Sequence, residues 1–256
     1  MAIMNLTPDS FYDGGSLKSE KAILLAAEKH LAEGATILDL GAMSSRPGAK
    51  EIALDEELAR LLPGIKAIRK EFPTSILSAD TYRSEVVCQA VDAGVDIIND
   101  ITAGRMDEKM LATVAEHRVP YVMMHMQGTP ATMQANPTYT DVVEEVTDFF
   151  IDRVEKAKTI GIHDIVIDLG FGFGKTAQHN FSLLKHMQRF QLFGYPILAG
   201  ISRKSMITKT LGISSKEALN GTTALNMIAL ANGASILRVH DVKEAQQCIK
   251  LAHALN

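Results

Sequence analysis

The sequence predicts an α/β fold, a single (β/α)8 TIM barrel that spans residues 1–256. The chain has 256 residues, the usual size of one such barrel. Short β-rich apolar runs alternate eight times with amphipathic helical stretches, as in parallel βα units. Polar side chains lie at the ends of these runs. In a barrel they gather at the C-terminal mouth of the strands, where the active sites of this fold lie.

The composition narrows the class of protein. Hydrophobic residues make up 46% and charged residues 22%, and no linker or low-complexity stretch divides the chain, which favours one domain with a large core. A net charge of -4 gives no reason to expect nucleic acid or a membrane as partner, so a phosphate ligand needs local cations. Cys88 and Cys248 lie in apolar helical segments and are interpreted as buried thiols. With no signal peptide or membrane-length apolar run, we expect a reduced, cytoplasmic enzyme.

Eight strands are predicted from β-rich apolar runs. In chain order they are Ala2–Asn5, Thr36–Leu40, Ile76–Ala79, Ile97–Asn99, Tyr121–His125, Ile165–Asp168, Ile197–Gly200 and Ser235–Val239. Helices are expected between them, because apolar residues recur there at helical spacing, as in 22–26 and 142–150. Little precedes the first strand to cover the barrel floor, which fits the removal of upstream residues.

A weak internal repeat supports these units. In each copy a helix ends, a glycine takes the left-handed position after it, and an apolar strand begins within a few residues. The copies are 33–37, 93–97, 160–165 and 232–236. Eight similar units fit a closed barrel better than a doubly wound sheet, although periodicity by itself does not prove closure.

Polar residues stand at the end of every predicted strand. They are Asn5, Asp39, Asp80, Asn99, His125, Asp168, 202–204 and 238–241. One polar residue at a strand end is usually a cap or a turn former. A complete ring of them indicates a site.

The cations of this ring favour an anionic ligand. Arg203 and Lys204 follow the seventh strand, and Arg238 and His240 follow the eighth. The loops after these two strands are the recurrent phosphate-binding location in barrels. Arg46, beyond the second strand, adds a guanidinium suited to bidentate contacts. Any one of these side chains alone is more often a solvated surface charge.

The run 168–175, with sequence DLGFGFGK, indicates a flat ligand. Its glycines let backbone approach a ring, and Phe171 or Phe173 can offer an aromatic face. Without Walker spacing it is only a weak phosphate-loop signal, and Asp168 can also be a structural cap.

Other polar residues fit the same ligand. Asp168, near Lys204 and the amide of Asn99, can read the donor–acceptor edge of a heterocycle, and Asp80 can hold a second ring nitrogen. These residues together predict a nitrogen-rich ring that carries phosphate.

The metal signals are sparse. His125 and His240 have no partner at zinc spacing, which favours a neutral structural or phosphate-bonding role. Asn5 is an acceptable oxygen donor to magnesium bridging a diphosphate. No arrangement demands a nucleophile, and a reaction with a good leaving group needs none.

The motifs resemble those of dihydropteroate synthases, in that family's order and across nearly the whole chain. The matching segments are 3–15, 39–48, 80–81, 98–100, 124–128, 168–175, 202–205 and 238–242. Ser45 stands where the family often has threonine, Leu169 where proline is frequent, and Met43 where a polar residue is common. None of these departures removes a reacting group.

The resemblance implies a reaction. It is the condensation of 6-hydroxymethyl-7,8-dihydropterin diphosphate with p-aminobenzoate to 7,8-dihydropteroate and pyrophosphate, in folate biosynthesis. The substitution is expected to be dissociative and SN1-like, because a cation-like carbon needs a positioned amine more than an activated one. The resemblance also implies Mg²⁺, sulfonamides as competing ligands, a homodimer, and mobile loops that carry Phe11 and Arg46 over the bound diphosphate.

The resemblance also implies roles for individual residues. The catalytic group is Lys204, Arg46, Asp80 and Asp168. Pterin binding falls on Asp80, Asn99, Asp168, Phe173 and Lys204. Diphosphate binding falls on Asn5 (through magnesium), Arg46, Arg238 and His240. p-Aminobenzoate binding falls on Phe11, Ser45, Pro47, Phe173, Lys204 and Ser205.

Three alternatives remain. A methyltetrahydrofolate-dependent methyltransferase would keep Asp80, Asn99 and Asp168 but has no use for 7–11 or 202–205. A non-catalytic pterin-binding protein is less favoured because the reacting groups are present. A phosphosugar-binding barrel explains the Arg238 cluster but not Asp168 with Phe173.

Overall fold

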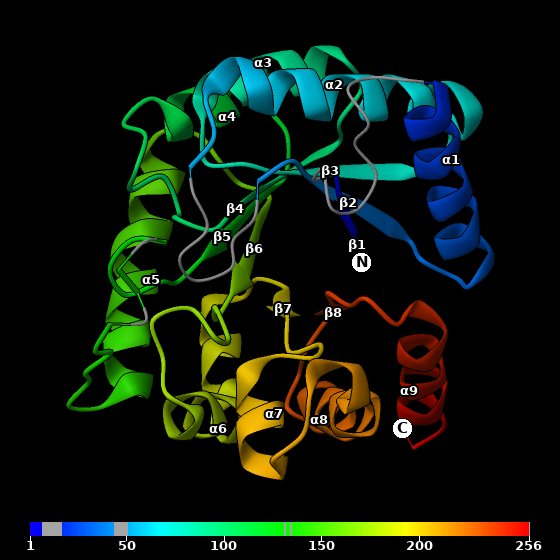
Figure 1. The fold of residues 1–256 in the computed structure, drawn as a ribbon. Helices are drawn as coiled ribbons and strands as arrows, with labels where there is room; N and C mark the ends of the chain where they lie inside the picture. The colour runs from blue at the N-terminus through cyan, green and yellow to red at the C-terminus, as the bar shows by residue number, and fades with distance from the viewer. Residues whose placement is uncertain (7–16, 44–50, 131, 134, 256) are drawn as a thin grey trace.

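The structure is a computed structural model that describes residues 1–6, 17–43, 51–130, 132–133 and 135–255. Eight parallel strands lie in chain order, and helices surround them (Figure 1). The strands are β1 Ala2–Asn5, β2 Ile37–Gly41, β3 Ile76–Asp80, β4 Ile97–Asp100, β5 Tyr121–Met124, β6 Ile165–Asp168, β7 Ile197–Ala199 and β8 Ile236–Leu237.

The helices lie outside this sheet, and most connect consecutive strands. They are α1 Leu17–Ala32, α2 Leu54–Glu71, α3 Ser84–Asp92, α4 Met110–His117, α5 Val142–Thr159, α6 Ala177–Lys185, α7 Ser205–Leu211, α8 Leu219–Ala231 and α9 Val242–Ala254, with 3-10 helices η1 Met187–Phe193 and η2 Ser215–Glu217. Every strand pair is parallel, because a helix returns the chain to the same end of the sheet.

Hydrogen bonds between the first and last strands close the barrel. Val239 lies just beyond β8 and bridges Ala2 in parallel. The amide of Ile3 donates to Val239 O at 2.9 Å, and the amide of Val239 donates to Met1 O at 3.0 Å. The predicted (β/α)8 barrel is therefore confirmed, and the doubly wound sheet is excluded.

The predicted strand bounds are right to within two residues. The largest difference is β8, predicted over 235–239 and found over Ile236–Leu237. Strand β8 is short because Ile236 and Leu237 are the residues in register with β7. Val239 forms its backbone hydrogen bonds with residues of the β1 segment. The four repeat glycines all have positive φ, between 92° and 106°, as the repeat predicts.

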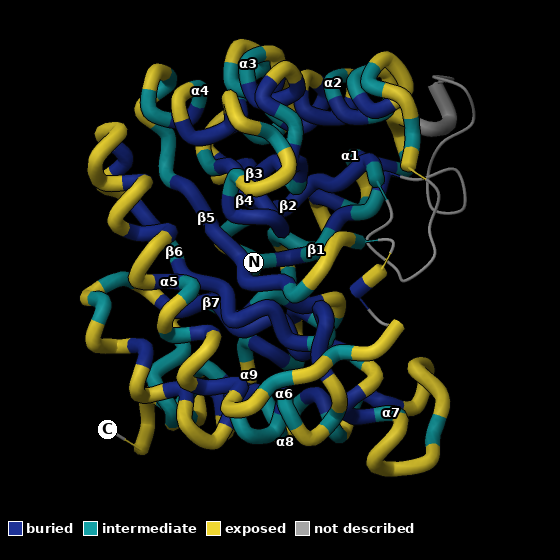
Figure 2. The backbone as a smooth tube through the Cα atoms, turned by 90° about the vertical axis from the view of Figure 1, so that its left-hand side faces the viewer, coloured by how far each residue is buried: buried dark blue, intermediate teal, exposed yellow. Residues whose placement is uncertain are grey.

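The described residues form two clusters of buried apolar side chains. The large one packs the strands against the helices, and the buried backbone forms the centre of Figure 2. Helix α5 illustrates how it forms. Asp141 caps the helix by accepting hydrogen bonds from the amides of Val143 and Glu144, and Val146 and Phe150 turn to the core.

The smaller cluster lies at the C-terminal mouth. It comprises Tyr82, Ile101, Met124, Met126, Met133 and Phe173, with Met43 packed against it. Most of its members follow strands β3 to β6, so an apolar wall stands beside the polar strand ends.

Two further observations concern the cysteines and the membrane. Cys248 is buried, Cys88 is partly buried, and both are free thiols. Among the helices that the structure describes, none combines the length and the apolar character needed to cross a bilayer.

Candidate active site at the mouth of the barrel

The predicted polar ring gathers at the carboxyl ends of the strands. Asn5, Asp80 and Asp168 are the last residues of β1, β3 and β6, and Asn99 is the second-last residue of β4. Asp80 stands in register with Asn99, and Asp168 with Met124. Strand pairing therefore continues to the last residue of β3 and of β6.

Asp39 is the centre of the polar network. This fully buried carboxylate accepts hydrogen bonds from Ser78 Oγ at 2.6 Å, Asn99 Nδ2 at 3.0 Å and Arg238 Nε at 2.7 Å. The ring of polar strand ends included Asp39, but sequence reasoning gave it no role. Its partners come from β3, β4 and the segment after β8, so only the closed barrel shows the connection.

Arg238 joins two carboxylates. Its Nη2 lies 2.7 Å from Asp80 Oδ2, in addition to the Asp39 contact. Desolvation raises the pKa of Asp80 to about 7, and the Arg238 charge opposes this rise. Arg238 therefore connects the carboxylate predicted to bind pterin with the side predicted to bind diphosphate.

The loop after β6 carries Asp168 and bends sharply. Asp168 is buried, and its Oδ1 accepts a hydrogen bond from the Gly170 amide at 2.8 Å. Desolvation raises the pKa of Asp168, while Lys204 lowers it. A Cβ at Gly170 would lie 1.8 Å from His125 O, and one at Gly174 would lie 2.6 Å from Gln127 O. Both positions also have positive φ, so glycine is required there.

The buried side chain of Lys175 fixes this loop through hydrogen bonds. Its buried Nζ lies 2.8 Å from His125 Nδ1 and donates to the carbonyl oxygens of Gly170 at 2.9 Å and Phe173 at 3.1 Å. Burial lowers the pKa of His125 well below its usual value, and the neighbouring Lys175 adds to this. His125 is thus a neutral structural residue. Sequence reasoning assigned Lys175 no role, because a lysine in a loop is normally exposed.

Lys204 lies along the glycine loop. Its Nζ donates to Phe171 O and is 4.7 Å from the centroid of the Phe173 ring. Desolvation lowers the pKa of Lys204 to about 8. Phe171 is fully buried in the large core, whereas Phe173 belongs to the cluster at the mouth. Of the two rings that the sequence offered, Phe173 is the one at the site.

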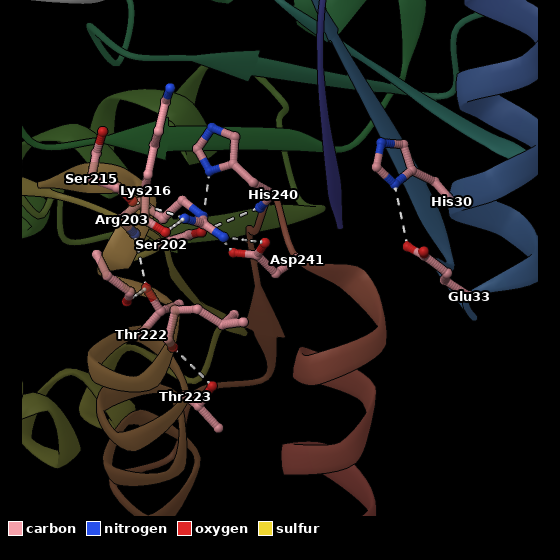
Figure 3. A network of polar contacts seen from close by, with 12 residues as sticks. His30, Glu33, Ser202, Arg203, Ser215, Lys216, Thr222, Thr223, His240 and Asp241 are labelled. Carbon is pink, nitrogen blue, oxygen red and sulfur yellow. Dashed lines mark hydrogen bonds and ion pairs between the residues drawn. The ribbon is translucent and has the colours of Figure 1, made fainter.

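Arg203 is not one of the anion-binding cations, which corrects the sequence-based interpretation. Its Nε and Nη2 each donate to Asp241 at 2.8 Å, and its Nη1 donates to the carbonyl oxygens of Ser215 and Lys216 (Figure 3). Four of the five N–H groups are thereby used within the protein.

His240 and Ser205 stand at the same edge. His240 Nδ1 lies 3.1 Å from Ser202 Oγ (Figure 3). Desolvation of the ring lowers the pKa of His240 to about 4, and Arg238 adds to this effect, so the imidazole is neutral near pH 7. Ser205 is exposed and begins α7. A neutral His240 can donate one ring N–H to phosphate.

Several predicted residues lie outside the described residues, namely Phe11, Ser45, Arg46 and Pro47. Conversely, sequence reasoning missed the apolar wall. Ile101 and Met124 are buried beside Phe173, and their position at strand ends was the available signal. A flat ring can pack on this wall and offer its polar edge to Asp168, Asn99 and Lys204.

Comparison with known proteins identifies the family of the chain. The family model described as "Pterin binding enzyme" matches residues 1–240. The dihydropteroate synthase of Haemophilus influenzae is 43% identical over 256 residues, which cover 99% of this chain and 92% of that protein. The synthase of Synechocystis is 43% identical over 258 residues, covering 100% of this chain and 89% of that protein.

Solved structures show the same likeness. The Yersinia pestis dihydropteroate synthase with a sulfonamide drug complex has a TM-score of 0.93 at 38% identity, covering 100% of this chain and 93% of that one. The Xanthomonas albilineans enzyme with 4-aminobenzoic acid has a TM-score of 0.92 at 40% identity, covering 100% and 92%. The chain belongs to the pterin-binding enzyme family and, within it, to the dihydropteroate synthases.

Proposed function

We propose that this protein condenses 6-hydroxymethyl-7,8-dihydropterin diphosphate with p-aminobenzoate to form 7,8-dihydropteroate and pyrophosphate. The observation that supports this reaction best is the grouping of side chains at the mouth of the barrel. Asp168, Asn99 and Lys204 lie there beside the apolar cluster of Phe173 and next to Arg238. The Xanthomonas albilineans relative solved with 4-aminobenzoic acid supports the second substrate. The 43% identity to dihydropteroate synthases over nearly the whole chain favours this reaction over the methyltransferase alternative.

The pterin ring would lie on Phe173, Met124 and Ile101. Asp168 Oδ1 is held by the Gly170 amide, which leaves Oδ2 to accept from the amino and ring N–H groups. The Asn99 amide donates from Nδ2 to Asp39, which leaves its oxygen to accept from the pterin. Acceptors on two strands and the Lys204 donor together match the edge of a pterin.

The diphosphate would bind at the Arg238 side of the mouth. Arg238 supplies positive charge, and neutral His240 supplies an N–H donor. Arg46, outside the described residues, is the third proposed ligand. These groups would stabilise the diphosphate as it departs.

Asn5 fits a magnesium ion shared with the diphosphate. Within the part of the chain that the structure describes, no group of three or more His, Cys, Asp or Glu side chains is suited to a metal. Mg²⁺ commonly takes one or two protein oxygens and completes its shell with phosphate oxygens and water. The amide oxygen of Asn5 at the end of β1 would be such a ligand, and the ion would neutralise charge on the diphosphate.

The substitution would proceed through a cation-like carbon. The bond between the pterin methylene carbon and the diphosphate oxygen breaks, and its electron pair leaves with the diphosphate. The carboxylates of Asp168 and Asp80 favour the positive charge that develops on the pterin. The amine of p-aminobenzoate then bonds to this carbon and loses a proton to water. Held in place, such an amine needs no general base.

p-Aminobenzoate would lie above the methylene carbon. Its proposed contacts are Phe173, Lys204 and Ser205 among the described residues, and Phe11, Ser45 and Pro47 outside them. Sulfonamides, which share the aromatic amine, would compete for the same place. The relative from Yersinia pestis solved with a sulfonamide drug supports this proposal.

We also propose a homodimer in the cytoplasm. Helix α8 leaves Ile228 exposed, and the exposed Leu211 of α7 packs beside Gly221 of the same helix. A second copy of the chain would cover this face. Sedimentation velocity tests it, since Ile228→Glu should shift the protein to monomer, whereas an unchanged sedimentation coefficient would refute this face.

A pyrophosphate-release assay tests the reaction. Release should require both substrates, and omitting either one should abolish it. Release without p-aminobenzoate at the same rate would indicate a pterin diphosphatase instead. No release with both substrates and Mg²⁺ present would refute the proposed function.

A further inference from the structure

We propose that Arg203 is a positioning residue that fixes the distance between the pterin side and the diphosphate side of the mouth. The inference rests on the proposed function. Its basis is the Arg203–Asp241 ion pair, which joins the loop carrying Lys204 to the loop carrying His240 (Figure 3).

The Arg203 guanidinium forms a two-sided clamp. Nε and Nη2 donate to the two carboxylate oxygens of Asp241 at 2.8 Å each. This bidentate geometry fixes orientation as well as distance. The other side donates from Nη1 to Ser215 O and Lys216 O, also at 2.8 Å each. Three segments, the loops after β7 and β8 and the helix η2, thus meet on one side chain.

The backbone of Arg203 is held in an uncommon conformation. Its φ is 55°, in the left-handed region that few residues other than glycine adopt. The Arg203 amide donates to Thr222 Oγ1 at 3.0 Å, and the buried Thr222 hydroxyl donates to Ala218 O at 2.8 Å. Contacts from α8 therefore stabilise a left-handed backbone conformation that is unfavourable for arginine. Such strained residues are common at functional sites.

Asp241 is dedicated to this clamp. It occupies the N-cap position of α9, where an aspartate usually accepts from the first free amides of the helix. Asp241 makes no such capping bond. Both of its carboxylate oxygens accept hydrogen bonds from Arg203 instead. The Asp241 side chain therefore joins the two loops and does not cap the helix.

The neighbours of Arg203 reach both parts of the proposed site. Ser202 Oγ lies 3.1 Å from His240 Nδ1 and accepts from the His240 amide at 3.3 Å. On the other side, Lys204 Nζ extends to Phe171 O beside the Phe173 ring. Loosening the clamp would leave each half formed but would change the spacing between them.

The chain offers a matched control at the opposite end of the barrel. Arg69 contacts Asp96 through Nη2 at 2.6 Å and donates to the carbonyl oxygens of Gly94, Pro73 and Ser75. It joins two loops that precede strands β3 and β4, on the face that contributes stability and not catalysis. Arg69→Met therefore removes a comparable clamp far from the mouth.

The test compares ligands that span the site with ligands that fill half of it. Calorimetry would measure pterin diphosphate, 6-hydroxymethylpterin and magnesium pyrophosphate on wild type, Arg203→Met, Arg203→Lys and Arg69→Met. In Arg203→Met the spanning ligand should lose on the order of tenfold or more in affinity, while each half-ligand stays close to wild type. Arg203→Lys should recover part of the loss, and Arg69→Met should lower Tm without changing any of the three affinities.

The outcomes separate this proposal from the proposed function. Wild-type affinity of Arg203→Met for pterin diphosphate, or equal losses for all three ligands, would overturn the positioning role. If Arg203→Met does not fold, an Arg203→Lys variant that binds all three ligands like wild type would overturn it equally. A wild-type protein that releases no pyrophosphate with both substrates would instead refute the reaction.

Discussion

The Nη2 of Arg238 lies 2.7 Å from Oδ2 of Asp80. The cation proposed for the diphosphate thus contacts the carboxylate proposed for the pterin. Arg238 also contacts the fully buried Asp39, so a single guanidinium balances two carboxylates at the mouth. A diphosphate bound as proposed would compete for this charge and would couple the two halves of the first substrate electrostatically.

Removing the Arg238 charge should destabilise the protein. Arg238→Met leaves Asp39 buried and Asp80 half-buried without their counterion, and an uncompensated buried charge costs about 3–5 kcal/mol. Urea unfolding near neutral pH measures this loss. Arg238→Lys, which keeps the charge, should lose less. A free energy of unfolding for Arg238→Met within about 1 kcal/mol of wild type would contradict the described network.

The pH dependence of catalysis should show two limbs. Desolvation raises the pKa of Asp80 to about 7, so its ionised, accepting form increases as the pH rises through 7. Desolvation lowers the pKa of Lys204 to about 8, so its protonated form is lost above that pH. Hence kcat/KM for pterin diphosphate should rise near pH 7 and fall near pH 8.

Two variants show which residue produces each limb of the pH profile. Asp80→Asn should flatten the rising limb, and Lys204→Gln should remove the falling one. The ionisations of the substrate are common to all three proteins and cancel in the comparison. Superimposable normalised profiles for wild type and both variants would show that neither group titrates in the reaction.

Lys204→Gln should lower turnover more than it lowers pterin affinity. Lys204 Nζ contacts both Phe171 O and the Phe173 ring, beside the proposed pterin and p-aminobenzoate positions. The variant loses a charged donor in the assembly of the second site as well as in the first. The measurement is kcat with both substrates saturating, with exposed Lys209→Gln on α7 as the control. Wild-type turnover in Lys204→Gln would refute the assignment.

p-Aminobenzoate should bind weakly to the protein alone and more tightly once Mg²⁺ and pyrophosphate are present. Its proposed contacts come from separate loops, such as Phe173 after β6 and Ser205 after β7. The sequence predicts that Arg46 closes on the diphosphate and brings Pro47 with it. Such coupling is typically about 1–3 kcal/mol. Calorimetry with and without pyrophosphate measures it for p-aminobenzoate and for a sulfonamide, and equal affinities would refute ordered binding.

The fold was predictable because each unit carries a local signal. A glycine such as Gly94 follows a helix, an apolar strand comes next, and a polar residue such as Asn99 lies close to the end of that strand. Closure was not predictable in this way, since it depends on Val239 pairing with Ala2 across the whole chain.

The site was predictable as a ring of residues but not as a network. Strand ends converge in a barrel, so Asp80, Asp168 and Lys204 could be brought together from the sequence. The sequence does not show which charges neutralise each other. Arg203 and Lys204 are neighbours of like charge, yet Arg203 contacts Asp241 and Lys204 reaches the Phe171 carbonyl at the mouth. Only the three-dimensional structure shows which partner each of these two side chains has.

Binding of the pterin at the C-terminal end of β6 can be tested directly on Asp168. Asp168→Asn keeps an oxygen for the Gly170 amide, so the loop is preserved while the carboxylate charge is lost. One weakened charge-assisted hydrogen bond costs about 1.5–3 kcal/mol. Asp164→Asn makes the same change at the exposed N-terminal end of the strand. Calorimetry should show pterin diphosphate binding weakened by this amount in Asp168→Asn and unchanged in Asp164→Asn. Equal affinity in both variants and wild type, with folding intact, would contradict the account.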